Sequence, residues 1–307
     1  MKQVLKFLVK WFLFFLLASV AIFWFVRQMP VSPAEQMLSY YQLPATPENI
    51  AIVEKDMGLD KPLPQQYVQW IVNFVRGDWG VSYVSHMDIR SQFMKKMPYS
   101  FGIGIGGMLI SAVISFFLGY GAALKPGRIC DRLSELLVIL SRSFPEFLMS
   151  IVVIYVVGVK FKLVKFFTGN GFLSFFIAIL ITAVYMTGTL SRVCKVHFEE
   201  QLQQSYVRFA VSRGFSKGYV LLHHSYKPVL YGMFSAMIAK FAWILGGSSV
   251  LEFAFTIPGI SYFLVDSMKA RDYMVLQTYV LVLLIWMFFV HLVFRVLLQF
   301  LDVRSRA

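Results

Sequence analysis

The sequence predicts an all-α, polytopic transmembrane helical bundle of about six spans. Composition is the first observation behind this prediction: 58% of the 307 residues are hydrophobic and 15% are charged, whereas soluble domains carry about 25% charged residues. The second is a mean hydropathy of +0.67, because a soluble fold of this size could not bury so much apolar surface. The third is that long apolar segments recur along the whole chain, so we expect a single transmembrane domain over residues 1–307.

Six apolar segments reach the roughly 20 residues that a helix needs to cross the hydrocarbon core. Their approximate bounds are 8–28, 100–124, 133–158, 171–191, 229–251 and 275–298. The first segment follows three lysines like a signal peptide, but its apolar run exceeds the usual length of about 7–15 residues, so we interpret it as a retained span. The third is the weakest candidate because it contains charged residues and Pro145, which is expected to kink it.

Lys and Arg residues are distributed unevenly between the short connecting segments. Fourteen lie in the two tails and in the loops 125–132 and 192–228, against five in the loops 159–170 and 252–274. Cytoplasmic loops of membrane proteins are enriched in these residues, so both termini and the loop 192–228 are expected in the cytoplasm. The formal net charge of +13 then reflects this bias, and no nucleic-acid partner is predicted.

The external segment 29–99 is too long to be a plain connector and is expected to carry two short helices. The Thr-Pro-Glu run at 46–48 has the pattern of a helix N-cap, a proline in the first helical position and an acid in the first turn. That helix should stop near Gly58. Apolar residues at helical spacing predict a second helix over about 65–76, ended by Gly77. We interpret the segment as a helical cap over the pore mouth.

Motifs of catalysis and nucleotide binding are missing or misleading. The sequence contains no phosphate-binding loop, zinc-protease motif or nucleophile elbow, so we assign no catalytic residue, cofactor or metal site to this chain. Gly102, Gly104 and Gly107 spell a dinucleotide-binding fingerprint, but they lie in an apolar span, where close helix packing explains them better. The two cysteines show no metal-binding spacing, and an adjacent histidine pair is interpreted as solvated.

Three charged residues fall within the predicted spans: Arg142, Glu146 and Lys240. A charge at mid-bilayer costs about 2.5–3.5 kcal/mol on insertion scales, and such residues often mark transport pathways. Arg142 and Glu146 are four positions apart, so one interpretation is a helical ion pair that only neutralises itself. The other interpretation is that Glu146 and Lys240 pair across the pore and line the pathway.

The loop 192–228 is polar and basic and lies between two predicted spans. Gly214 fits a left-handed C-cap that ends one short helix, and Ser216 fits the N-cap of the next. These residues predict a helix–turn–helix on the cytoplasmic face. By themselves they leave open whether it is a docking element or a plain connection.

Several motifs together resemble the dipeptide/oligopeptide/nickel family of ABC-importer permeases. The residues similar to that family's ATPase-coupling loop are Phe209, Ala210, Val211, Gly214 and Lys217. The residues similar to its downstream signature are Gly246, Gly247, Glu252, Pro258, Gly259, Arg271 and Asp272. Motifs within 46–82 resemble the family's external loop, so the likeness runs nearly end to end.

The resemblance implies the fold of a type I ABC-importer permease in a bacterial inner (plasma) membrane, surrounded by membrane lipid. It implies a sister permease as heterodimer partner, an extracellular substrate-binding protein and two cytoplasmic ATPase subunits that bind ATP and magnesium. This chain would form the translocation pathway and catalyse nothing. The family transports nickel, metal chelates and short peptides, and the run 43–48 looks somewhat like the nickel branch, which favours nickel slightly over peptides.

Two other functional classes are alternatives to an importer permease. A secondary transporter or channel without an ATPase partner would show inverted repeats and broken helices in both halves, and no repeat is visible. A membrane enzyme would need a polar catalytic cluster, and none is found in the sequence. Co-purification with a separate ATPase would distinguish the importer from both.

Overall fold

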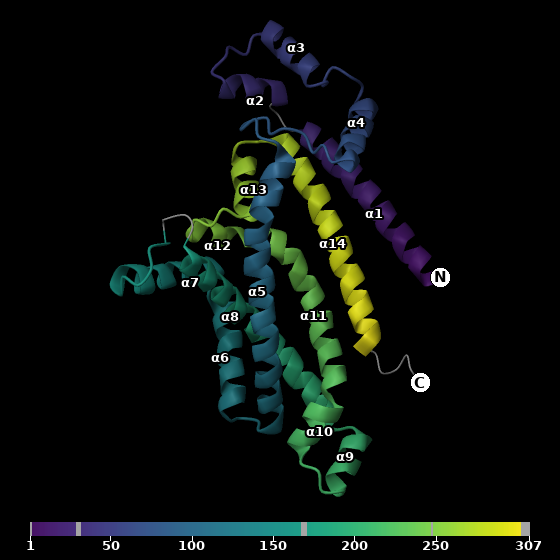
Figure 1. Cartoon of the computed structure of the whole chain (residues 1–307), viewed down its shortest axis with the longest axis vertical. Coiled ribbons are helices and arrows are strands. Elements are labelled where there is room, and N and C mark those ends of the chain that lie inside the picture. Colours follow the sequence, from purple (N-terminus) through teal and green to yellow (C-terminus); the bar gives the residue numbers. More distant parts are fainter. Residues whose placement is uncertain (1, 29–31, 167–170, 247, 302–307) are drawn as a thin grey trace. The chain divides into compact units, whose positions relative to one another are not determined.

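The computed structural model of the chain (Figure 1) is built from helices throughout the part that it describes. The described residues are 2–28, 32–166, 171–246 and 248–301. Within these ranges, the only extended pairing is an isolated bridge between Val81 and Asp88. The predicted all-α class is therefore confirmed.

Four helices among the described residues are long and apolar enough to cross a membrane. They are α1 (Lys2–Arg27), α5 (Ile89–Leu124), α8 (Phe172–Leu202) and α14 (Tyr273–Leu301). A further candidate is a broken segment, in which α6 (Ile129–Ser143) is bent by 102° from α7 (Glu146–Val153) and the π-helix η1 (Ile154–Lys160). The expected single helix over 133–158 is thus two helices that meet at Pro145, because proline cannot continue the hydrogen-bond ladder.

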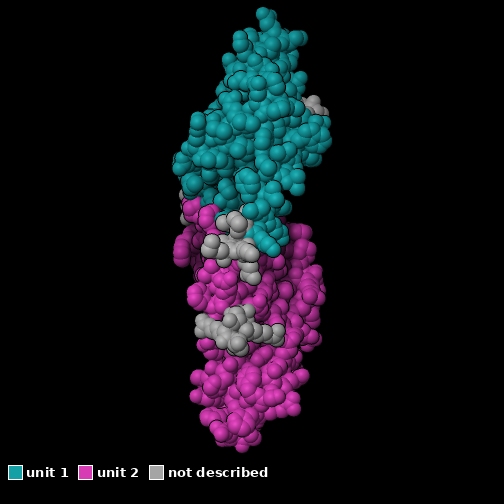
Figure 2. Space-filling model, turned by 90° about the vertical axis from the view of Figure 1, so that its right-hand side faces the viewer, with its two compact units in different colours: residues 1–97, 263–288 teal, residues 98–262, 289–307 magenta. Residues whose placement is uncertain are grey.

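The remaining helices are short or lie beside these spans. Helix α11 (Tyr226–Gly246) covers most of the predicted segment 229–251. The shorter ones are α2 (Pro33–Tyr40), α3 (Pro47–Asp56), α4 (Leu63–Arg76), α9 (Ser205–Ser212), α10 (Lys217–His224), α12 (Ser249–Ala254) and α13 (Ile260–Lys269). The chain divides into two compact units, coloured separately in Figure 2: residues 1–97 with 263–288, and residues 98–262 with 289–307. Helices α5, α13 and α14 each run through a unit boundary, so no linker separates the units.

The first unit contains the predicted external helices. Helix α3 begins after Thr46, whose hydroxyl accepts a hydrogen bond from the Asn49 backbone nitrogen at 3.3 Å. Helix α4 ends at Gly77, which has the left-handed φ of +91° expected of such a cap. Helix α2 was not predicted, although Ser32 and Glu35 form a reciprocal capping box at its start.

Aromatic packing and one arginine hold this first unit together. The rings of Phe74 and Trp79 stack with centroids 5.3 Å apart. Arg27, at the end of α1, lies 3.7 Å from the centroid of the Phe23 ring and donates hydrogen bonds to Gln66 of α4 and Gln277 of α14. One guanidinium therefore ties three helices together.

The second unit packs α8 against α6 and α11, and its glycines explain the dinucleotide-like fingerprint. A Cβ atom on Gly102, Gly104 or Gly107 would lie no more than 2.6 Å from a side chain of a neighbouring helix. The side chains in question are those of Phe175, Ile244 and Thr182, respectively. These glycines serve close helix packing, as predicted.

Helix α8 continues to Leu202, well past the predicted end of its span at residue 191. Cys194 and Phe198 are fully buried along this extension, which is why a polar-looking segment remains helical. The predicted loop 192–228 is therefore helical over much of its length, through the end of α8, then α9, α10 and the start of α11.

Candidate functional site

The predicted helix–turn–helix consists of α9 and α10. Gly214, in the turn, has a left-handed φ of +95°, and a Cβ added to it would meet no atom within 4 Å, so the backbone rather than crowding requires glycine there. The hydroxyl of Ser216 accepts a hydrogen bond from the Tyr219 backbone nitrogen at 3.3 Å and caps α10. Both predicted caps are confirmed.

One face of this element is anchored and the other is open. Val207, Val220 and Leu221 are buried, and the Tyr206 hydroxyl lies 2.8 Å from that of Ser225. The residues that resemble a coupling loop lie on the less covered side. Among them Phe209, Gly214 and Lys217 are exposed, whereas Ala210 and Val211 are partly buried.

Phe209 is 58% exposed, and the guanidinium of Arg213 lies 4.7 Å from its ring centroid. Phe215 and Tyr219 add further exposed aromatic surface, with their rings stacked 5.6 Å apart. Exposed aromatic residues on a rigid, capped element are typical of a protein-docking surface.

The break between α6 and α7 creates the second feature of the site. The Phe144 carbonyl at the break accepts a hydrogen bond from the Tyr185 hydroxyl of α8 at 2.7 Å. Pro145 then occupies the N-cap of α7, and Glu146 is its first residue. A carboxylate at this position is favoured by the partial positive charge of a helix N-terminus.

Arg142, Glu146 and Lys240, the three charges predicted inside the spans, line one cavity of about 410 Å³. Its other lining residues are Ser141, Thr182, Tyr185, Met186, Thr189 and Ala239. The atom Oε1 of Glu146 and the hydroxyl of Thr182 are covered and have no hydrogen-bond partner within the described protein. The cavity thus offers unsatisfied polar atoms together with charges of both signs.

Neither of the two predicted ion pairs forms. No acid lies within 4.0 Å of Arg142 or Lys240 in the described part of the chain. The pair between Arg142 and Glu146 fails because the helix ends between them, which removes the geometry of one helical turn. Glu146 and Lys240 share the cavity, as expected for residues at similar depth, but they are not in contact as an ion pair.

Glu252 of α12 is the centre of a buried network that we call the carboxylate hub. Its carboxylate is fully buried and accepts hydrogen bonds from the Ser100 hydroxyl at 2.6 Å, the Ser248 hydroxyl at 2.7 Å and the Tyr262 backbone nitrogen at 2.7 Å. The Ser261 hydroxyl lies 3.0 Å from that of Ser248 and completes the hub. These bonds connect α5, α12 and α13.

The other signature residues have distinct places. A Cβ on Gly259 would overlap the carboxyl group of Glu252, so this glycine makes room for the hub. Pro258 lines a separate, mainly apolar cavity of about 430 Å³. Gly246 ends α11, and Gly247 lies outside the described residues.

Asp272 anchors the loop around Ser82 to the start of α14. It is buried, accepts hydrogen bonds from the Ser82 hydroxyl and the Tyr83 backbone nitrogen, and caps α14 through the Val275 backbone nitrogen at 3.4 Å. Arg271 beside it is exposed and has a left-handed φ of +55°. Burial raises the pKa of Tyr83 to about 12.

Sequence reasoning missed the partners of these carboxylates. Ser100 and Ser82 are 152 and 190 residues away from the acids that they contact, and neither serine indicates by itself which acid it will contact. Only Ser248 was detectable in principle, since it precedes Glu252 by one helical turn. No group of three or more His, Cys, Asp or Glu side chains in the described ranges is placed to hold a metal ion.

Comparisons with known proteins agree with this architecture. Residues 115–307 match the family described as binding-protein-dependent transport system inner membrane component, and residues 1–104 match its N-terminal region. The chain is 29% identical over 285 residues to the glutathione transport system permease protein GsiC of Shigella boydii serotype 4 and to that of Escherichia coli strain K12. Each alignment covers 92% of this chain and 91% of the relative.

Proposed function

This chain belongs to the family of inner membrane components of binding-protein-dependent transport systems, and we propose that its cargo is a short zwitterionic peptide of the glutathione type. It is a non-catalytic, multi-pass membrane permease subunit of an ABC importer.

The observation that carries the cargo proposal is the cavity lined by Arg142, Glu146 and Lys240. A carboxylate oxygen that is covered and lacks a donor is unfavourable in an apolar surrounding, and a ligand ammonium group would supply the missing charge and donors. Arg142 and Lys240 have no acidic partner within the described chain and would receive a carboxylate. A peptide with free ends presents both groups on one molecule.

On the sequence alone, nickel has a slight preference over peptides as the cargo. Two observations favour the peptide: the relatives compared above are named for glutathione transport, and two cations in the cavity would repel a metal ion. Nickel or a metal chelate is kept as the alternative cargo, to be decided by uptake.

For coupling, we propose that α9 and α10 dock onto cytoplasmic ATPase subunits. Support comes from the exposed aromatic face around Phe209 and from the buried contacts of Val207, Val220 and Leu221, which transmit a displacement of the element to the helices. A sister permease would close the open side of the cavity, and an extracellular binding protein would deliver the cargo. Both termini would lie in the cytoplasm, as the distribution of Lys and Arg predicts.

The test is uptake of labelled glutathione, other short peptides and nickel in cells that carry the wild-type chain or Glu146→Gln or Lys240→Gln. We expect each substitution to reduce peptide uptake by roughly tenfold or more, since an ion pair to the cargo is lost. The matched controls are Glu135→Gln on α6 and Lys160→Gln on η1, which are exposed and lie outside the cavity.

Basal ATP hydrolysis by the assembled complex should persist in both cavity variants, because the coupling element is untouched. Loss of nickel uptake with unchanged peptide uptake would contradict the cargo proposal. Uptake that continues after inactivation of the ATPase subunits would contradict the coupling proposal.

A further inference from the structure

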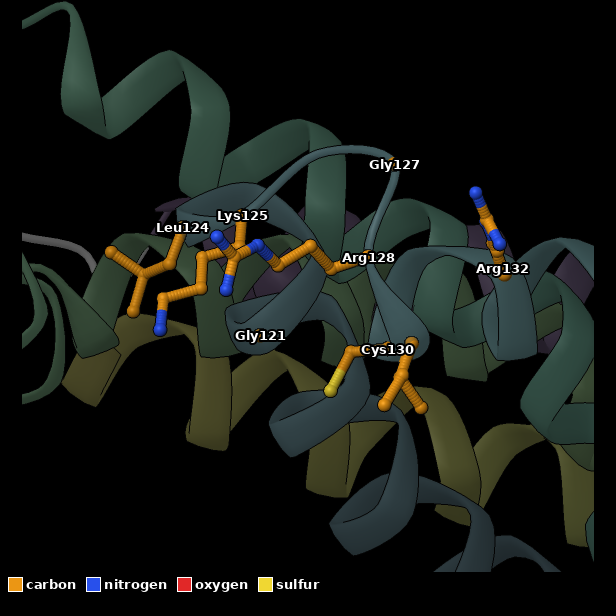
Figure 3. A pocket seen from close by; sticks show the side chains of 8 residues that line it. Gly121, Leu124, Lys125, Gly127, Arg128, Cys130 and Arg132 are labelled. Atoms are coloured by element: carbon orange, nitrogen blue, oxygen red, sulfur yellow. The ribbon is translucent and has the colours of Figure 1, made fainter.

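A basic cavity of about 580 Å³ lies at the turn between α5 and α6. Its lining residues are Gly121, Leu124, Lys125, Gly127, Arg128, Ile129, Cys130 and Arg132. Figure 3 shows the Arg128 side chain pointing toward that of Lys125, whereas Arg132 points away from both. Neither the transport pathway nor the coupling element proposed above uses this cavity.

The only acid in this turn is already engaged. Asp131 accepts a hydrogen bond from the Gly127 backbone nitrogen at 2.9 Å and forms an ion pair with Lys195 of α8 at 2.6 Å. It therefore fixes the turn onto α8 and does not neutralise the cations around the cavity. The nearest acid further along α6, Glu135, is exposed and lies more than 4.0 Å from every described cation.

Lys125, Arg128 and Arg132 are all exposed, and none has an acidic partner in the described part of the chain. Three uncompensated cations around one hollow form a site for an anion. Arg128, which points toward Lys125, suits a phosphate in particular, because a planar guanidinium group donates paired hydrogen bonds to phosphate oxygens.

An exposed apolar stripe begins at the same cavity. Ile129, which lines the cavity, is 83% exposed, and Leu133, Leu136 and Ile139 follow on the exposed surface of α6. Spacings of three and four residues place these side chains on one helix face. Cationic side chains thus line the cavity, and an exposed apolar stripe on α6 leads away from it.

The position of this arrangement is interfacial. Leu124 is the last residue of a candidate span, and Ile129 is the first residue of the next one. A turn that joins the ends of two spans lies at the level of the lipid headgroups, and basic pockets at that level are known to bind acidic headgroups.

We propose that this cavity binds an anionic phospholipid, with the headgroup phosphate at Lys125 and Arg128, Arg132 adding to the local positive charge, and an acyl chain along the α6 stripe. Charge complementarity selects the headgroup, and the continuous apolar stripe selects a lipid over free phosphate. The site is independent of the cargo, so its failure would leave the proposed function untouched.

Cys130 provides a reporter for the test, because it is a partly exposed thiol lining the cavity, while Cys194 is fully buried. The full chain in its transporter complex is reconstituted into nanodiscs of phosphatidylcholine, alone or mixed with phosphatidylglycerol. The rate of maleimide labelling at Cys130 is measured in each. We expect phosphatidylglycerol to slow labelling several-fold, and inorganic phosphate added to phosphatidylcholine discs to leave the rate unchanged.

The companion measurement is native mass spectrometry of bound phosphatidylglycerol. Each cation removed in the series Lys125→Gln, Arg128→Gln and Arg132→Gln should weaken binding by roughly fivefold. The charge-matched control is the triple variant with Lys55→Gln, Lys61→Gln and Arg76→Gln, which removes three cations from the first unit and should keep the lipid.

Equal labelling rates in the two lipid compositions would overturn the proposal. So would full retention of phosphatidylglycerol by the variant that lacks all three cavity cations. Protection of Cys130 that requires the sister permease and not the acidic lipid would identify the cavity as a protein contact, which also overturns it.

Discussion

Replacing Gly259 by alanine is expected to break the carboxylate hub. The new Cβ would lie 2.6 Å from Oε1 of Glu252 and closer still to its Cδ and Oε2, well inside the 3.0 Å that real Cβ contacts respect. Glu252 is fully buried and has its oxygens fixed by three donors, so it cannot swing aside as an exposed side chain would. The substitution therefore forces the carboxylate away from those donors.

The magnitude follows from the bonds that are lost. A hydrogen bond to a charged group contributes about 1.5–3 kcal/mol. If the displaced carboxylate keeps one of its bonds from Ser100, Ser248 and Tyr262, the loss of the other two costs about 3–6 kcal/mol. This is large beside the roughly 1 kcal/mol typical of point substitutions.

The assay is thermal unfolding of the detergent-purified complex, followed by the near-UV signal and by retention of the monodisperse peak. Gly106→Ala is the matched control on α5, because its nearest neighbour would be the Ile179 side chain at 3.3 Å, outside the 3.0 Å limit that Gly259→Ala violates. We expect the control to remain close to wild type, while Gly259→Ala unfolds at a clearly lower temperature.

A double-mutant cycle decides whether disruption of the hub causes the destabilisation expected for Gly259→Ala. In a Glu252→Ala background the carboxylate is absent, so Gly259→Ala should add little further destabilisation, giving a coupling energy of roughly 2 kcal/mol or more. If Gly259→Ala cost the same with and without the Glu252 side chain, the destabilisation would come from the backbone, and the reasoning about the hub would be refuted.

Two further predictions concern the loop that contains Tyr83 and the α9–α10 element. Because burial raises the pKa of Tyr83 from 10.0 to about 12, the folded state favours the neutral phenol, and the stability it contributes is present below pH 10 and lost as the pH rises through 12. Tyr83→Phe should flatten the loss of thermal stability in that pH window, and an unchanged alkaline slope would contradict the assignment. Ser216→Ala removes the cap of α10 at a cost of about 1 kcal/mol, and should lower cargo-stimulated ATP hydrolysis by the assembled complex. Ser212→Ala on α9 is its control, and equal effects of the two serine variants would refute a role for the cap.

The local features of this fold could be predicted because their causes are local. The cap at Thr46, the left-handed glycines at 77 and 214 and the cap at Ser216 each depend on a few neighbouring residues. The same holds for the break at Pro145. Helix α2 had an equally local capping box, and it was missed only because its apolar pattern is short.

The tertiary arrangement could not be predicted in this way. The hub joins Glu252 to Ser100 across 152 residues, and the sequence around either residue does not indicate that the two are in contact. The extension of α8 beyond residue 191 depends on burial of Cys194 and Phe198 against other helices, which a polar local composition conceals. Contacts between distant segments therefore determine both the hub and the length of α8.

The proline and the three charges, which the sequence presents as separate features, act together in the structure. A straight helix would place Glu146 one turn beyond Arg142, where the two would neutralise each other. Pro145 ends that helix instead, Tyr185 satisfies the carbonyl left at the break, and Glu146 becomes the first residue of α7. The break thus holds Arg142 and Glu146 apart on the wall of one cavity with Lys240. Separated charges of both signs are what the proposed zwitterionic cargo would require, and on that proposal the break in the span would have a functional reason.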